Sequence, residues 1–243
     1  MRKYYFPPSG FGFWYQLGIL SKLDEDSVIY GSSSGSLICL IYLLDKKYKN
    51  FDYLSCLANK IKNEIGYNYN LYVYVHKFVL KIISILYSQD IRKTMKRMKN
   101  IYIQYSKFSY IGFRLKIETV FKNPINFDNL YHLIQASCYI PILSRHRSLL
   151  YYEIDNELAI DGFFSNLSNV SNELIKINSY DYIHIIPCSK KKAKLWYNEG
   201  INYKFTNNKQ FSFIILIKVI CINILEIIKL LYDNMTNLLI KTK

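Results

Sequence analysis

A serine at the centre of a short glycine-flanked motif could carry out acyl transfer. Gly31-Ser32-Ser33-Ser34-Gly35 fits the pattern G-x-S-x-G; β-prone residues 28–30 precede it and the apolar run 37–44 follows. A strand that turns sharply into a helix pushes such a serine hydroxyl out at the top of a sheet, and side chains at the glycines would collide in so tight a turn. The amides that open the helix then point toward an anion beside the serine. Ser33 is therefore a candidate nucleophile; the alternative is a serine-rich surface loop, because the pattern also occurs by chance.

A serine hydroxyl needs a base to take its proton and donors to stabilise the oxyanion. Asp161 is one candidate base, because it ends the predicted strand 158–160 and active sites of parallel sheets usually lie at strand ends. His184 is the other, and it would complete the order Ser…Asp…His of α/β-hydrolases. However, Ser33 comes too early for that fold, and His184 lies in an apolar run where a lone histidine is more often a core residue.

Two strand–loop–helix units would position the serine. The first unit is a β-prone run at 4–6, a glycine-containing turn at 9–14 and a helix at 15–23. This helix has Leu17, Leu20 and Leu23 on one side. The second unit is a strand at 28–30, a loop at 31–35 and a helix at 36–44. Repeated units of this kind indicate an α/β protein with a mostly parallel central sheet.

The rest of the chain supplies further helices and strands. The patterns predict mostly helical structure over 51–104, strands at 102–105 and 113–120, a helix at 129–137, strands at 158–160 and 182–187, and a basic turn at 190–194. Residues 211–240 form a long apolar helix candidate that charged residues interrupt. We therefore expect it to pack in the core rather than to span a membrane, with an interfacial amphipathic helix as the alternative.

Composition and charge narrow the class of partner. The 243 residues allow a sizeable core in one large domain or two small ones, and the net charge of +14 favours anionic partners. Basic residues gather at 90–99, where a solvated helix face is the first interpretation and contact with an anionic membrane is the second. A nucleic-acid site is weaker because no recognition motif accompanies the run.

The cysteines and histidines indicate neither a disulfide framework nor a metal site. The five cysteines are scattered and lack a C-x-x-C pair. His76, His132 and His146 have no spacing that suggests a metal. No apolar stretch of signal-peptide length precedes the prolines at 7–8. We therefore expect an intracellular, reducing compartment.

Three blocks in order resemble the patatin-like phospholipase family, especially its adipose triglyceride lipase branch. Residues 9–18 are similar to the family's glycine-rich oxyanion loop and following helix, 31–35 to its nucleophile elbow, and 161–166 to the block that carries its catalytic aspartate. Residues 135–141 and 183–187 resemble the segments before and after that acid. The resemblance spans roughly residues 4–190.

The resemblance implies a three-layer α/β/α patatin-like fold in one domain over 1–243, with 211–240 as its C-terminal apolar helical segment. It also implies a Ser33–Asp161 dyad that needs neither histidine nor cofactor, with Ser33 attacking an ester carbonyl and Asp161 accepting its proton. The glycines of the elbow and of the acid block are Gly31, Gly35 and Gly162.

The oxyanion hole that the resemblance implies is made of backbone amides. These are the amides of Gly10, Phe11, Gly12 and Ser34. Two registers of the loop stay open: one puts Tyr15 where the family has a third glycine, and the other puts residues 8–10 at the glycines. The family's basic loop residue is not evident, and Phe163 replaces a small residue in a way that could narrow the pocket.

The function implied is hydrolysis of phospholipid or acylglycerol esters at an interface. The expected partners are the lipid substrate and an anionic membrane or lipid-droplet surface, and nucleic acid is not expected. The expected location is cytoplasmic with peripheral membrane association. Two alternatives remain: a weak or inactive lipid-binding homologue, and a Ser-His-Asp esterase that uses His184.

Overall fold

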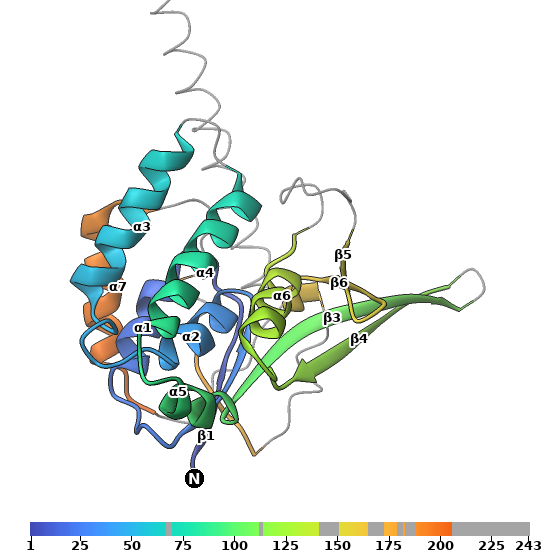
Figure 1. Cartoon of the computed structure of the whole chain (residues 1–243), viewed down its shortest axis with the longest axis horizontal. Helices are drawn as coiled ribbons and strands as arrows, with labels where there is room; N and C mark the ends of the chain where they lie inside the picture. Colours follow the sequence, from blue (N-terminus) through green and yellow to red (C-terminus); the bar gives the residue numbers. More distant parts are fainter. Residues whose placement is uncertain are drawn as a thin grey trace, which may run out of the picture.

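The computed structural model of the chain describes residues 1–66, 70–111, 114–140, 151–164, 173–178, 182 and 188–205. In this part a mixed sheet carries helices against one of its faces, and the β3–β4 hairpin projects away from the helices (Figure 1). The strands are β1 (Lys3–Phe6), β2 (Val28–Ser32), β3 (Ile101–Ile111), β4 (Arg114–Lys122), β5 (Tyr152–Ile154), β6 (Glu157–Ile160) and β7 (Ile175–Lys176).

The central strands of the sheet are parallel and its other pairs are antiparallel. The order is β5-β6-β3-β2-β1-β7, with β4 also paired to β3. The pairs β7–β1, β1–β2 and β2–β3 are parallel, whereas β3–β4, β3–β6 and β5–β6 are antiparallel. The predicted α/β class with a parallel centre is confirmed.

The helices begin where the sequence offers a capping side chain or a tight turn. They are α1 (Phe13–Leu20), α2 (Ser34–Tyr42), α3 (Phe51–Ile65), α4 (Leu71–Tyr87), α5 (Ile91–Met98), α6 (Phe127–Ser137) and α7 (Lys190–Ile201). Asn50, Asn70, Asp90 and Asn126 each accept a hydrogen bond from a first-turn amide of the helix that follows. None of the helices in the described part of the chain combines the length and the apolar character that a membrane span requires.

The main hydrophobic core lies between the helices and one face of the sheet. Side chains alternate along a strand, so Tyr4 and Phe6 of β1 join this core while Tyr5 points to the opposite face. There Tyr5 packs with Leu174, and Phe121 lies against them. Every helix named above contributes to the core on the first face. The described helices therefore form a layer against this face of the sheet.

The start of α7 and the extent of α1 differ from the sequence prediction. The basic turn expected at 190–194 is wrong, because Ser189 caps the amide of Lys192 and the lysines form the first turns of α7. The helix expected at 15–23 ends at Leu20, and all its residues are buried rather than one side of them. It packs between α2 and α7, and a Cβ at Gly18 would lie 2.1 Å from the Tyr197 carbonyl oxygen of α7.

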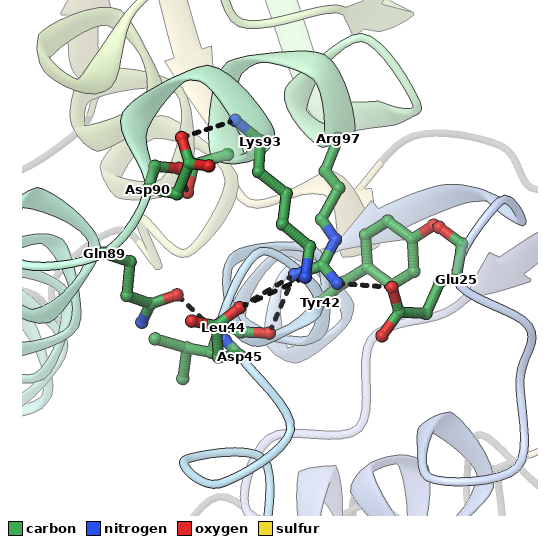
Figure 2. Close-up of polar contacts among 9 residues, drawn as sticks. Glu25, Tyr42, Leu44, Asp45, Gln89, Asp90, Lys93 and Arg97 are labelled. Carbon is green, nitrogen blue, oxygen red and sulfur yellow. Dashed lines mark hydrogen bonds and ion pairs between the residues drawn. The ribbon is translucent and has the colours of Figure 1, made fainter.

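The basic run at 90–99 forms α5, and one of its residues does not face solvent. Arg97 is only 7% exposed, so the interpretation of the whole run as a solvated face is wrong at this position. Its guanidinium lies 2.6 Å from a Glu25 carboxylate oxygen and 3.5 Å from one of Asp45, and it donates to the Leu44 carbonyl (Figure 2). Arg97 thereby ties α5 to the end of α2 and to the loop before β2.

Several predictions lie outside the described residues. These are His184 with the predicted strand beyond Tyr182, the helix candidate 211–240, and residues 165–166 of the acid block.

Candidate active site

The strand pairing explains how Ser33 and Asp161 come together. β4 pairs with β3 from Ile103 to Ile111 and so occupies one edge of that strand. Both β2 and β6 must then lie along the other edge, where Ser32 pairs with Gln104 and Ile160 pairs with Ser106. Because β2 is parallel and β6 antiparallel to β3, the two strands run toward each other. Asp161 follows a strand as predicted, but this strand is antiparallel to β3, and the carboxyl ends of β2 and β6 lie close together along β3.

Ser33 occupies a strained turn between β2 and α2. Its backbone has φ 53° and ψ −119°, and positive φ is uncommon for a residue with a side chain. A Cβ at Gly31 would lie 2.1 Å from the Gly35 carbonyl oxygen, and one at Gly35 would lie 2.0 Å from the Phe6 carbonyl oxygen. Both glycines are therefore required by close backbone approach, as the motif predicts.

The hydroxyl of Ser33 donates a hydrogen bond of 2.6 Å to Oδ2 of Asp161. Both side chains are buried, at 9% and 1% exposure. The Phe163 amide donates to the other carboxylate oxygen at 2.8 Å. Burial raises the pKa of Asp161 to about 7, although the hydrogen bonds from Ser33 and Phe163 act in the opposite direction. A carboxyl group that titrates near neutral pH is suited to take and return a proton.

The backbone of Asp161 is fixed from both sides. Its amide donates to the Tyr139 carbonyl at 2.7 Å, and its carbonyl accepts from the Ser106 hydroxyl at 2.9 Å. The next residue must be a glycine, because a Cβ at Gly162 would lie 2.0 Å from the Ser32 hydroxyl oxygen. These contacts hold the carboxylate against the elbow without using its oxygens.

Sequence reasoning missed the side chains that support Ser33 from α6. The Ser33 amide donates to the Ser137 hydroxyl at 2.8 Å, and that hydroxyl donates to the Gln104 carbonyl at 2.5 Å. The Cys138 sulfur lies 3.3 Å from the Ser33 carbonyl oxygen. The available signal was the pair of small polar residues at the end of a predicted helix, within a block that resembles a family segment.

The glycine loop before α1 is attached to the elbow through Ser34. The Ser9 amide donates to the Ser34 hydroxyl at 2.7 Å, and the two hydroxyls lie 2.9 Å apart. Ser34 also contacts Gln16 at 3.4 Å, and the Gln16 amide nitrogen donates to the Pro7 carbonyl at 2.6 Å. The loop is thus held at both of its ends beside the nucleophile.

The amides of this loop are not equivalent. Gly10 has φ 54°, so it adopts the conformation that favours glycine, and it is exposed. The Gly12 amide instead donates to the Ser9 carbonyl at 2.9 Å and is engaged within the loop. Ser34 opens α2, and the first amides of a helix have no partner in the helix itself. The Gly12 amide is therefore already occupied, whereas the Ser34 amide has no partner within α2.

The described histidines take part in other contacts. His76 hydrogen-bonds the Tyr131 hydroxyl at 2.7 Å, and His132 hydrogen-bonds that of Tyr152 at 2.6 Å. Across the described residues, no three His, Cys, Asp or Glu side chains are grouped as a metal site would require. Among the described residues, Asp161 is thus the titratable side chain that accepts a hydrogen bond from the Ser33 hydroxyl.

Comparisons of the chain with protein-family models, with curated proteins and with solved structures found no match. Function must therefore be argued from the site itself.

Proposed function

We propose that the protein is a serine acyl hydrolase that cleaves carboxylic esters of lipids through Ser33 and Asp161. The observation that carries the proposal is the 2.6 Å hydrogen bond between the two side chains, with Ser33 in a strained glycine-flanked turn. In the reaction, Asp161 accepts the hydroxyl proton while Ser33 Oγ attacks the ester carbonyl. Asp161 then returns the proton to the departing alcohol.

The second half of the reaction uses the same groups. Asp161 takes a proton from water, the resulting hydroxide attacks the acyl-Ser33 ester, and the fatty acid leaves as Ser33 regains its proton. Both tetrahedral intermediates carry an oxyanion, for which we propose the amides of Gly10 and Ser34 as donors. Loss of one such donor typically costs about 10²–10³ in rate.

A lipid substrate is supported by the side chains that follow the acid. Phe163 and Phe164 are 39% and 44% exposed, although both are large and apolar. They lie two and three residues after Asp161 in the turn Gly162–Phe164, so an apolar substrate would meet them beside the dyad. Phospholipids and acylglycerols both remain candidate substrates.

The face that meets the lipid is then the end of the sheet that carries Ser33. The basic helix α5 lies near the start of β1 (Figure 1). Asn100 follows α5, and its carbonyl accepts a hydrogen bond from the Ile29 amide near the start of β2. Ser33 follows the opposite end of that strand. A membrane held by α5 would leave the dyad facing away, so we do not assign α5 to substrate capture.

The resemblance to patatin-like phospholipases supports the same proposal. We accordingly propose a patatin-like, three-layer α/β/α domain for the whole chain, in which the described helices supply one outer layer. We expect no cofactor in this chemistry.

Release of fatty acid from a lipid panel, followed by mass spectrometry, tests the function. Ser33→Ala and Asp161→Asn should each lose at least about 10³ in rate, because each removes a group that reacts. The matched controls Ser84→Ala and Asp24→Asn change exposed residues and should retain wild-type activity. Equal activity in all five proteins would rule the dyad out.

A lipid-binding protein without hydrolase activity is the second candidate. The observation that favours it is the Gly12 amide, which donates to Ser9 and so is withheld from an oxyanion. Binding to anionic liposomes by a protein whose Ser33 does not react with a fluorophosphonate would support this candidate over the hydrolase.

A further inference from the structure

The long strand β4 leaves one of its edges open. All nine of its residues, Arg114–Lys122, pair with β3 in continuous register. No other described strand pairs with β4. In an antiparallel sheet, the backbone N–H and C=O groups of alternate residues point away from the paired neighbour, so this edge presents a row of hydrogen-bonding groups to another strand. The β3–β4 hairpin projects away from the described helices (Figure 1), so they do not cover its outer half.

Strand β4 lacks most of the features that block an open edge. Natural proteins protect such edges with short strands, prolines or bulges. β4 is longer than the usual strand of about five or six residues. It contains no proline, and its register with β3 is unbroken. Near its middle, Ile117 is 41% exposed. The charged side chains of β4 therefore decide which second strand this edge can accept.

The charges on either side of Ile117 are opposite in sign. Lys116 and Glu118 lie on the same face of the strand, because side chains two residues apart point the same way, and they form an ion pair of 2.5 Å. Their side chains are 53% and 43% exposed, so both can reach a neighbouring strand. Lys122 differs from Lys116, because it already pairs at 2.8 Å with Asp155 near the other edge of β3.

A second copy of the same strand would complement these charges in one register. In a symmetric pair of antiparallel strands, residues equally far from the symmetry axis on either side face each other. With the axis at Ile117, Lys116 faces the partner's Glu118, and this contact occurs twice. An axis at Glu118 would place two glutamates opposite each other, and an axis at Lys116 would place two lysines opposite each other. The charges thus favour the register centred on Ile117.

We propose that two copies of this chain pair through β4, in antiparallel register centred on Ile117, and join their sheets edge to edge. Each Lys116 then lies between its own Glu118 and the partner's Glu118, in a network of four alternating charges. Such an edge-to-edge contact is small, so we expect reversible association at micromolar concentrations rather than a permanent dimer. Strands β2 and β6 lie along the other edge of β3, so the dyad takes no part and the proposal does not depend on the hydrolase function.

Exchange of the two charges tests this register. Sedimentation velocity of the full chain from about 1 to about 100 µM should show the molar mass rising toward that of a dimer. Lys116→Glu and Glu118→Lys each place like charges opposite each other twice, and each should weaken association at least about tenfold. An equimolar mixture of these two variants regains opposite charges at both contacts and should dimerise as wild type does. The double variant Lys116→Glu/Glu118→Lys should also dimerise.

Two controls separate the register from general effects of charge. Lys46→Glu and Glu199→Lys make the same changes of charge at exposed positions outside β4, and they should associate as wild type does. Far-UV circular dichroism checks that each variant is folded. Hydrogen exchange gives a second measurement: amides within 114–120 should gain protection with rising concentration in wild type but not in Lys116→Glu.

Three results would overturn the proposal. A wild-type protein that stays monomeric throughout the concentration range would remove the interface. Association that is unchanged in Lys116→Glu would place the contact elsewhere. Failure of the two mixed variants to dimerise, when both are folded, would exclude the register centred on Ile117. None of these results depends on fatty-acid release, so the dyad is tested separately.

Discussion

Ser32 and Ile160 end two strands that run toward each other along the same edge of β3, where their partners are Gln104 and Ser106. A single residue of β3, Tyr105, lies between these two partners, and it is fully buried. The residues that follow the two strands, Ser33 and Asp161, therefore lie close together. This head-on meeting explains how side chains so distant in sequence form a 2.6 Å hydrogen bond.

The elbow glycine Gly35 should be irreplaceable for packing reasons. Gly35→Ala places a methyl group where the Phe6 carbonyl oxygen lies 2.0 Å away, and we expect a loss of about 1–3 kcal/mol in the free energy of unfolding with loss of hydrolysis. Gly66 is the control, because it has φ 69° but nothing within 4 Å of its Cβ position. Gly66→Ala should cost roughly 1 kcal/mol and retain activity. Urea unfolding measures the stability of the two variants, and fatty-acid release measures their activity. An active, stable Gly35→Ala protein would contradict the requirement for glycine at this position.

Hydrolysis should depend on the ionisation of Asp161. The base must be deprotonated, and burial raises its pKa to about 7, so kcat/KM should rise with pH through about 7 and level off above it. Measurement on a soluble short-chain ester from about pH 5 to about pH 9, which brackets this pKa, gives the profile. A rate that is already maximal at the lower end of this range would mean that Asp161 is not the base.

The same raised pKa makes Asp161 costly for stability at neutral pH. The folded-state pKa exceeds the ordinary value of 3.8, so the unfolded chain loses this proton first as pH rises. The penalty is absent below about pH 4, grows between about 4 and 7, and is complete above about 7. Asp161→Asn should therefore raise the melting temperature most above pH 7, with a gain that disappears on acidification. A rise in melting temperature that does not vary with pH would contradict this prediction.

The Ser34 hydroxyl should act on the rate through the glycine loop, whereas the Ser34 amide, the proposed oxyanion donor, is kept in Ser34→Ala. Ser34→Ala removes the acceptor for the Ser9 amide, and the loop loses its attachment to the elbow. We expect kcat to fall by about 10–10² while Ser33 still reacts with a fluorophosphonate. Ser21→Ala, which removes a hydroxyl bonded to the Gly18 carbonyl, is the control and should leave kcat unchanged. Equal kcat in both variants would remove this role from Ser34.

Arg97 should contribute to stability and not to catalysis. Its carboxylate partners Glu25 and Asp45 have side chains 66% and 36% exposed, so they regain water when the arginine is lost. We therefore expect Arg97→Met to cost about 1–3 kcal/mol, less than for a fully buried pair. Lys96→Met on the exposed side of α5 should stay within about 0.5 kcal/mol of wild type. The midpoints of urea unfolding test this prediction. Equal midpoints for Arg97→Met and Lys96→Met would contradict the role of Arg97.

The parts of this site that could be predicted from sequence are local. The strand–turn–helix around Ser33 is specified by neighbouring residues, since Gly31 and Gly35 allow the turn and apolar residues follow it. Asp161 was identifiable because it ends a short apolar strand. The α/β class followed from repeated units of the same kind.

The parts that could not be predicted depend on contacts between distant segments. The direction of β6 is decided by its pairing with β3, which no pattern within four residues specifies. The support of the Ser33 amide by Ser137, and the burial of Arg97 within a basic run, likewise need partners far along the chain. Helix α1 is buried all round because α7 covers it, and charged residues had made the start of α7 resemble a turn.

Reaction with a fluorophosphonate, mapped by mass spectrometry, tests the central claim most directly. The account predicts one adduct, on Ser33, that forms in wild type, is absent from Ser33→Ala and forms at least about 10²-fold more slowly in Asp161→Asn because the hydroxyl has lost its base. An adduct on another serine, or equal labelling of wild type and Asp161→Asn, would contradict it.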